Sequence, residues 1–204
     1  MNEIDTTECN HLKSFILLMA LHLEKLVDEI DIDSIKWMLT EIQDAKRVFL
    51  LGTGRSGLVG RAFAMRLMHL GFSSHVVGEI TTPAVSDEDI VIAISGSGQT
   101  PSVEYWSKVA KDRGATVIAI TSNKDSKLRN LADIVIELPG RTKEDAGRYL
   151  EHHTHGEYSK LTPLGTSFET SASVFLDGVI AEIIYIKGAS ETDLNSKHAN
   201  LEGL

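Results

Sequence analysis

The stretch VFLLGTGRSGLVGRA, residues 48–62, runs from an apolar segment through a glycine-rich turn into a helix-like pattern. Its glycines, Gly52, Gly54 and Gly57, have the spacing of the turn that binds dinucleotides between a strand and a helix. Glu79 follows about 20 residues later, where an acid that binds the ribose would be sought. The stretch therefore indicates a phosphate-binding turn, whose phosphate belongs either to a nicotinamide dinucleotide or to a smaller molecule.

The composition is that of an ordinary globular protein. The 204 residues are 42% apolar and 24% charged, and a chain of this length can bury a core without a disulfide or a metal. The net charge of −9 argues against a nucleic-acid partner. The single cysteine, Cys9, excludes an internal disulfide and favours the cytoplasm. The apolar run 15–23 is too short to cross a membrane, so no membrane partner is expected either.

The hydrophobic pattern alternates between strands and helices. Apolar, β-branched runs predict strands, and apolar residues spaced by three and four predict helices. This alternation is typical of an α/β protein whose parallel sheet is covered on both faces. The predicted strands are 47–52, 74–78, 89–95, 116–121 and 133–138, and the predicted helices are 10–30, 33–45, 57–70, 101–113, 125–131 and 166–187.

We interpret the whole chain as one domain. The polar segment 139–165 is long for a loop in a compact domain, and loops of this length are usually functional or mobile. The domain has three parts: N-terminal helices (1–45), an α/β core with a closing helix (46–188) and a polar tail (189–204).

Two of the predicted helices carry more apolar surface than one sheet face needs. Helices 10–30 and 166–187 are apolar over more than one stripe, which indicates either an oligomer contact or burial within the chain. Asp33 is the expected N-cap of the helix that follows the first. We expect Trp37 and Trp106 to pack inside the protein.

Two hydroxyl-rich loops follow strands of the predicted sheet. Ligands of open parallel sheets bind beyond the carboxyl ends of the strands. The loop GTGRSG (52–57) carries Ser56, and the loop SGSGQT (95–100) carries three more hydroxyls and runs into a helix that begins with Pro101. Glycine backbones and free N–H groups at helix N-termini suit a compact phosphate monoester, although the second loop taken alone could be a flexible turn.

The second loop also bears on the dinucleotide hypothesis. A dinucleotide-binding protein needs one glycine-rich loop and has no use for a second, hydroxyl-rich one. Neither loop ends in the Gly-Lys-Ser/Thr of a nucleotide-binding P-loop, which disfavours ATP. A small phosphate-bearing ligand is therefore the better interpretation.

Five segments in a fixed order carry a resemblance to a known family. They are GRSGLVGRAFAMRLMHLGF (54–72), VVGEITTP (76–83), ISGSGQT (94–100), PLGTSFE (163–169) and KHANLE (197–202). With them the chain resembles the sugar isomerase (SIS) domain family and, within it, the 6-phospho-3-hexuloisomerases. Those enzymes interconvert 3-hexulose 6-phosphate and fructose 6-phosphate. The sequence departs from their usual pattern at residues 144–161, which are longer and richer in histidine.

The resemblance implies a fold, a set of partners and a set of binding residues. The fold is a three-layer αβα sandwich with a five-stranded parallel sheet, flavodoxin-like, with the N-terminal helices alongside. The partners are a sugar-phosphate substrate, further copies of the chain in a tetramer or dimer that shares its active site, and a functional link to 3-hexulose-6-phosphate synthase; no metal or organic cofactor is implied. Ser56, Ser95, Ser97 and Thr100 would bind the phosphate, and Gly54, Arg55 and Gly96 would contact the substrate.

Moving a carbonyl between C3 and C2 requires a base, for which Glu169 is the first candidate. A carboxylate is a suitable base if burial raises its pKa toward the working pH. On the residues alone, Thr166 and Glu169 also fit a capping box. The resemblance favours catalysis, because related isomerases place a glutamate at this helix start. Glu79, at the end of a strand, is the second candidate and could instead be an ordinary solvated acid.

Two further residues are candidates for charge and proton handling. Arg55 could neutralise the ligand or the enediolate, or form an ordinary surface ion pair. His198 lies in a polar tail where a histidine is usually solvated, but the resemblance implies that it reaches an active site, which can belong to a neighbouring subunit. Its imidazole could then move protons between the two oxygens.

Three histidines, His152, His153 and His155, invite a metal hypothesis that their spacing does not support. Two functions other than hexulose phosphate isomerisation also stay open. One is isomerisation of a different sugar phosphate, such as a seven-carbon one, and the other is a sensor that binds a phosphosugar without turnover.

Overall fold

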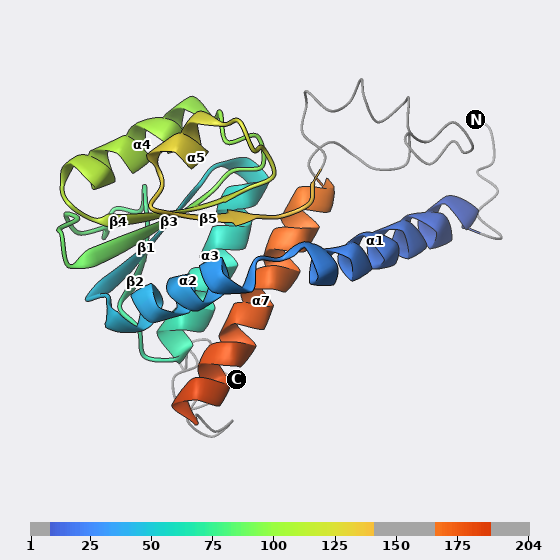
Figure 1. Cartoon of the computed structure of the whole chain (residues 1–204), viewed down its shortest axis with the longest axis horizontal. Coiled ribbons are helices and arrows are strands. Elements are labelled where there is room, and N and C mark those ends of the chain that lie inside the picture. The colour runs from blue at the N-terminus through green and yellow to red at the C-terminus, as the bar shows by residue number, and fades with distance from the viewer. Residues whose placement is uncertain (1–8, 141–165, 189–204) are drawn as a thin grey trace.

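Five parallel strands form the centre of the molecule in the computed structural model, which describes residues 9–140 and 166–188. Their order across the sheet is β2-β1-β3-β4-β5, and every neighbouring pair is parallel (Figure 1). The predicted parallel sheet is therefore confirmed. The strands are β1 (Arg47–Gly52), β2 (Ser74–Val76), β3 (Asp89–Ile94), β4 (Thr116–Thr121) and β5 (Ile134–Glu137).

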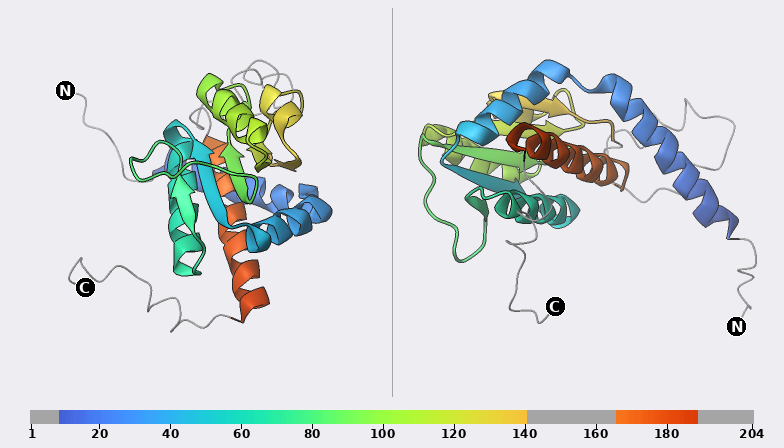
Figure 2. Two further views of the ribbon diagram at one scale, coloured as in Figure 1. Left: turned by 90° about the vertical axis from the view of Figure 1, so that its left-hand side faces the viewer. Right: turned by 90° about the horizontal axis from the view of Figure 1, so that it is seen from below.

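Helices cover both faces of this sheet, which gives the three layers of an αβα sandwich (Figures 1 and 2). One face carries α2 (Ile32–Asp44), α3 (Gly54–His69) and α7 (Thr166–Lys187). The other face carries α4 (Pro101–Asp112) and α5 (Lys127–Leu131). The fold class expected from the sequence is confirmed.

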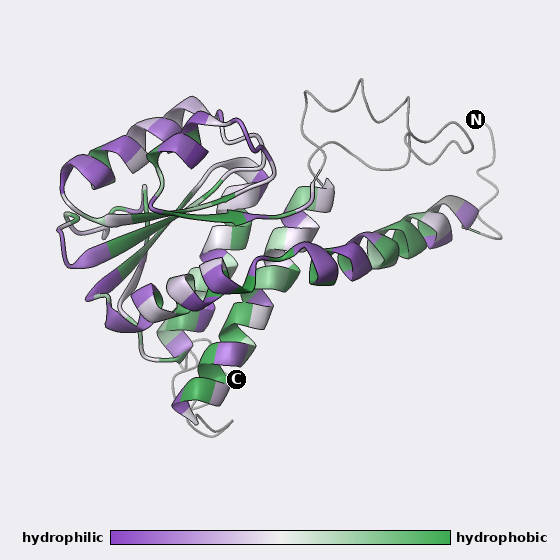
Figure 3. Cartoon of the chain, in the orientation of Figure 1, coloured by the Kyte–Doolittle hydropathy of each residue, from purple (hydrophilic) through white to green (hydrophobic). Residues whose placement is uncertain are grey.

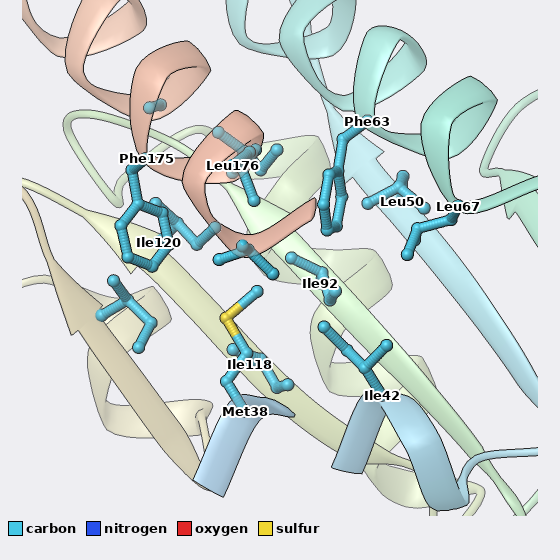
Figure 4. Packing of buried hydrophobic residues seen from close by; sticks show 14 of the residues in the cluster. Met38, Ile42, Leu50, Phe63, Leu67, Ile92, Ile118, Ile120, Phe175 and Leu176 are labelled. Atoms are coloured by element: carbon cyan, nitrogen blue, oxygen red, sulfur yellow. The ribbon is translucent and has the colours of Figure 1, made fainter. Parts of the chain in front are cut away.

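The core lies in two layers because successive side chains of a strand point to opposite faces. Leu50 and Ile92 belong to the layer under α2, α3 and α7, which Figure 4 shows from close by. Phe49 and Val91, one residue earlier in each strand, belong to the layer under α4 and α5. Burying each such side chain contributes roughly 1.5–3 kcal/mol, so these two layers hold the strand ends, and the loops after them, in fixed positions.

α1 (Asn10–Glu29) extends away from the sheet and touches the body near its C-terminal half (Figures 1 and 2). The Nε2 atom of His22 lies 2.9 Å from Ser171 Oγ of α7 and 3.2 Å from the carbonyl oxygen of Pro139. Figure 3 shows apolar residues along the exposed part of this helix. They are Leu12, Ile16, Leu17, Leu21 and Val27.

The structure corrects several boundaries. Asp31, not Asp33, caps α2, because its carboxylate accepts hydrogen bonds from the Asp33 N–H and the Ser34 hydroxyl. The helix after the first glycine-rich turn begins at Gly54, not at residue 57, and β2 ends two residues earlier than predicted, at Val76. The tryptophan prediction is wrong as well, because Trp37 and Trp106 both lie exposed on helix surfaces.

Some predictions fall outside the described residues. These are the course of 141–165 with its three histidines, and the tail 189–204 with His198. The division of the chain into three parts of one domain stays a prediction. Among the helices of the described ranges, none combines the length and apolar character needed to cross a membrane.

Candidate active site

The turn between β1 and α3 brings the helix N-terminus very close to the end of the strand. A Cβ at Gly57 would lie 2.9 Å from the Gly52 carbonyl oxygen, so only glycine permits this approach. Ser56, in the first turn of α3, is buried. The glycine pattern that resembles a dinucleotide-binding turn thus serves close strand–helix packing, and it leaves Ser56 and the first N–H groups of α3 at the carboxyl edge of the sheet.

The hydroxyls of the loop between β3 and α4 form hydrogen bonds within the loop. Ser95 is buried, and its Oγ shares a hydrogen bond of 3.1 Å with Thr100 Oγ1 and accepts one of 3.2 Å from the Gly98 N–H. The Ser97 Oγ accepts a hydrogen bond of 3.3 Å from the Gln99 N–H. The three hydroxyls predicted to bind phosphate therefore sit in one compact turn at the N-terminus of α4.

Residues after β4 support this loop from behind. The Gly96 carbonyl oxygen accepts hydrogen bonds from the Ser122 N–H and hydroxyl, and the Ser97 carbonyl oxygen accepts one from Asn123 Nδ2. Neither supporting residue was predicted from the sequence. The signal available was the polar pair SN directly after an apolar strand, at the same sheet edge as the two loops.

Glu169 lies in the first turn of α7, beside the first loop. Its side chain is 14% exposed, and Arg55 Nε donates a hydrogen bond of 3.2 Å to its Oε2. Burial raises the pKa of this carboxyl above its ordinary value, against the opposing effects of the Arg55 charge and of hydrogen bonds that include one with Ser56. Residues 114 positions apart in the chain thus meet at one place.

Glu79 has a different setting. It follows β2, its side chain is 44% exposed, and it forms an ion pair with Arg61 of α3. Both candidate bases are therefore paired with arginines of α3, but the Glu169 side chain is the less exposed of the two, and burial raises its pKa. Arg61 was not singled out in the sequence, where nothing distinguished it from other arginines on helix surfaces.

The remaining substrate-contact candidates are backbone positions. Gly54 is the first residue of α3 and has φ of +56°, and Gly96 lies between Ser95 and Ser97. Within residues 9–140 and 166–188, no group of three or more histidine, cysteine or acidic side chains is arranged to hold a metal ion. The arrangement offers hydroxyls and helix N-termini for a phosphate, and a shielded carboxylate for a proton.

The fold around this site is that of a known family. The SIS domain family matches residues 41–149, more than half of the chain. The chain belongs to the SIS domain family.

Within this family, the chain is similar to proteins named 3-hexulose-6-phosphate isomerase. The chain is 39% identical to the 3-hexulose-6-phosphate isomerase of Bacillus subtilis, over 79% of this chain and 83% of that protein. It is 42% identical to the 3-hexulose-6-phosphate isomerase of Methanocaldococcus jannaschii, over 80% of this chain and 82% of that protein.

A solved structure gives the same picture. A Methanococcus jannaschii protein, for which the crystal structure infers the function of a 3-hexulose-6-phosphate isomerase, has a TM-score of 0.75 to this chain at 38% identity. The match covers 91% of this chain and 96% of that one. The resemblance drawn from five sequence segments is thereby confirmed.

Proposed function

We propose that this phosphosugar isomerase interconverts D-arabino-3-hexulose 6-phosphate and D-fructose 6-phosphate. The observation that carries the proposal is the shielded Glu169 carboxylate, with its raised pKa, beside two hydroxyl-lined turns of the SIS fold. The named relatives, 39% and 42% identical over most of their length, support this choice of substrate.

In the proposed reaction, Glu169 takes the proton from C2 of the 3-ketose. The electron pair of the C–H bond forms the C2–C3 double bond, and the carbonyl oxygen at C3 becomes the oxyanion of a cis-enediolate. Return of the proton to C3, with transfer of a proton from O2 to O3, gives the 2-ketose. A base with a pKa raised toward the working pH suits both halves of this exchange.

The two turns would hold the substrate by its phosphate. Ser56, Ser95, Ser97 and Thr100 supply hydroxyls, and the N-termini of α3 and α4 supply N–H groups and the positive ends of their dipoles. Gly54 and Gly96 allow the backbone to approach the ligand. A phosphate fixed at this edge leaves the sugar chain to extend toward α7.

Charged groups near the base would handle the developing negative charge. Arg55, 58% exposed and in contact with Glu169, can turn its guanidinium toward the enediolate. His198 would move protons between O2 and O3, from this chain or from a neighbouring copy. Glu79 would bind sugar hydroxyls, and its greater exposure makes it the weaker candidate for the base.

The proposal includes an oligomer and a metabolic partner. A tetramer or dimer would cover the apolar residues along α1 and would let the C-terminal tail of one copy reach the site of another. A 3-hexulose-6-phosphate synthase would supply or consume the substrate. The enzyme would work in the cytoplasm.

The two alternative functions predict different measurements. A different SIS isomerase would bind the same phosphate and turn over another sugar, and a sensor would bind without turnover. The shielded carboxylate favours an enzyme, because a sensor has no need of a base in a position where ionisation is costly.

The decisive experiment is the turnover of 3-hexulose 6-phosphate, with fructose 6-phosphate detected through coupling enzymes. The wild-type protein should be active, and Glu169→Gln should lower kcat at least about 100-fold because the base is lost. Glu182→Gln, an exposed glutamate on the same helix, is the matched control and should keep full activity. Binding of fructose 6-phosphate to an inactive wild-type protein would instead support another substrate or a sensor.

A further inference from the structure

Phe168, the residue directly before Glu169, occupies a socket with no spare room. Its side chain is 1% exposed. A Cβ built on Gly96 would lie 2.9 Å from its Cδ1, and one built on Gly140 would lie 2.6 Å from its Cβ. Both distances are shorter than real side chains adopt, so two glycines from two different loops make the space that this phenylalanine fills.

One wall of the socket is the phosphate-binding turn itself. Gly96 lies between Ser95 and Ser97, and its carbonyl oxygen accepts hydrogen bonds of 3.1 Å from the Ser122 N–H, 2.9 Å from the Ser122 hydroxyl and 3.2 Å from the Thr121 hydroxyl. The peptide that the ring touches is therefore fixed to the end of β4.

The other wall of the socket is Gly140, which lies shortly after β5. A Cβ built on Gly140 would lie 2.6 Å from the Phe168 Cβ and 2.9 Å from its Cα, so the backbone of α7 at this point lies close to the chain that follows β5. Phe168 thus packs the N-terminus of α7 against the loops after β3 and β5.

Because Phe168 directly precedes Glu169 in α7, its contact with Gly96 affects where the Glu169 side chain points. Successive residues of an α-helix point about 100° apart, so a ring held in the socket directs the next side chain to a different part of the surroundings. That next side chain is Glu169, which meets Arg55 and Ser56. Any slip of the ring against Gly96 would displace the carboxylate relative to the phosphate site, and a displacement of 1 Å can cost about 100-fold in rate.

We propose that Phe168 is a positioning residue that sets the separation between the Glu169 carboxylate and the phosphate-binding turn. This separation decides which carbons of a bound sugar phosphate the base reaches, with Gly96 and Gly140 as the surfaces that fix it. The proposal deepens the proposed function and rests on it where it concerns the rate of isomerisation.

The test uses complementary changes of size on the two sides of the contact. Phe168→Leu removes ring atoms, Gly96→Ala adds a methyl group, and the double variant combines them. Phe175→Leu, at a buried phenylalanine two turns along the same helix, is the matched control for the loss of a core ring. The measurements are kcat and KM for 3-hexulose 6-phosphate, the melting temperature, and the pKa of Glu169 from NMR of ¹³C-labelled glutamate, with Glu169→Gln assigning the signal.

Phe168→Leu should lower kcat about 10-fold or more while KM changes less than about three-fold, because the base moves and the phosphate loop stays. Gly96→Ala should lower kcat to a similar extent, because the added methyl group displaces the ring. The double variant should recover part of kcat, since leucine leaves room for the methyl group. The pKa of Glu169 should fall toward its ordinary value in Phe168→Leu, as a misplaced carboxylate gains contact with water. Phe175→Leu should lower the melting temperature and leave kcat and this pKa unchanged.

The proposal is overturned if Phe168→Leu behaves like Phe175→Leu, with a lower melting temperature and an unchanged kcat and Glu169 pKa. It is also overturned if the fold-loss of kcat in the double variant equals the product of the fold-losses in the two single variants. A wild-type protein that fails to turn over 3-hexulose 6-phosphate contradicts the proposed function instead. In that case the pKa of Glu169 in the four variants still decides whether Phe168 positions the carboxylate.

Discussion

At the scale of the residue, Glu169 is set apart by two opposing influences on its pKa. Burial raises it, and the Arg55 guanidinium and the hydrogen bonds to the carboxylate lower it, with burial prevailing. Arg55 is more than half exposed, so it can leave the carboxylate when an anionic ligand arrives. The carboxylate would then become more basic at the moment when a base is needed.

The acidic limb of the pH–rate profile should report this balance. A base works only when it is unprotonated, so kcat/KM should fall as the pH drops through the pKa of Glu169, with a midpoint above the ordinary value of 4.5. Arg55→Gln should move this midpoint to higher pH, because the charge that lowers the pKa is gone. The measurement is kcat/KM against pH for both proteins.

The control for this prediction is Arg61→Gln. Arg61 lies on the same helix as Arg55 but pairs with Glu79, so its loss should leave the acidic midpoint in place. A midpoint that moves with Arg61 and not with Arg55 would transfer the role of base from Glu169 to Glu79.

At the scale of the element, the loop of residues 95–100 depends on Gly98. Its φ is +59°, and a Cβ there would lie 2.2 Å from the Ser126 Oγ and 3.0 Å from the Thr121 Oγ1. The loop therefore closes against the start of α5 only with glycine at this position. Ser126 is the N-cap of α5, so the turn of residues 95–100 and that short helix are fixed to each other.

Gly98→Ala should weaken phosphosugar binding at least about 10-fold and lower stability by more than the roughly 1 kcal/mol that a positive φ costs alanine. Gly188→Ala separates the two causes, because Gly188 has φ of +61° and no atom of the described residues lies within 4 Å of the added Cβ. It should show the conformational cost alone, with normal ligand binding. Urea unfolding and calorimetric titration with fructose 6-phosphate check both variants, and equal behaviour of the two would contradict the steric account.

The opposite edge of the sheet is held by an ion pair between the first residues of β1 and β3. Arg47 Nη2 lies 2.7 Å from Asp89 Oδ2, and the Asp89 carboxylate, which is fully buried, also accepts hydrogen bonds from the Ser86 N–H and hydroxyl. Burial acts to raise the pKa of Asp89, but the hydrogen bonds from Arg47 and Ser86 and the Arg47 charge together hold it below its ordinary value.

Arg47→Met should lower the free energy of unfolding by about 3 kcal/mol, because Asp89 would stay buried without its partner. Lys46→Met is the control, since the neighbouring Lys46–Glu88 pair is exposed and contributes less than about 1 kcal/mol. The stabilisation by Asp89 is complete above its ordinary pKa of 3.8 and is lost as the pH falls through the lower value of the folded state. Urea unfolding at neutral and acidic pH measures both effects, and equal losses in the two variants would contradict the assignment.

At the scale of the whole molecule, the sequence predicted those features of the fold that depend on residues adjacent in the chain. Apolar runs predicted all five strands, and their carboxyl ends predicted that Ser56, Ser95, Ser97 and Thr100 would lie at one sheet edge. The turn 95–100 could be recognised because its hydroxyls, its glycines and Pro101 are adjacent in the chain.

Contacts between distant segments could not be predicted in this way. The meeting of Arg55 with Glu169, and the fit of Phe168 between Gly96 and Gly140, depend on where α7 returns to the sheet, which no short pattern encodes. The tryptophan prediction was wrong for a related reason. Hydrophobicity alone places Trp37 inside, but the face of α2 that meets the sheet is occupied by Met38, Leu39 and Ile42.

The apolar surface of α1 carries the last prediction. Leu17 and Leu21 are exposed on a helix that extends from the body, and burying each in a contact between copies would contribute roughly 1.5–3 kcal/mol. The wild-type protein should therefore have a mass of two or four times 22.3 kDa by light scattering on a sizing column.

Replacing both leucines by glutamine should reduce that mass, and Lys13→Gln with Lys25→Gln, on the same helix, should not. If His198 acts in a neighbouring site, the dissociated form should also lose activity. A monomeric, active wild-type protein would contradict both the contact between copies and the shared site.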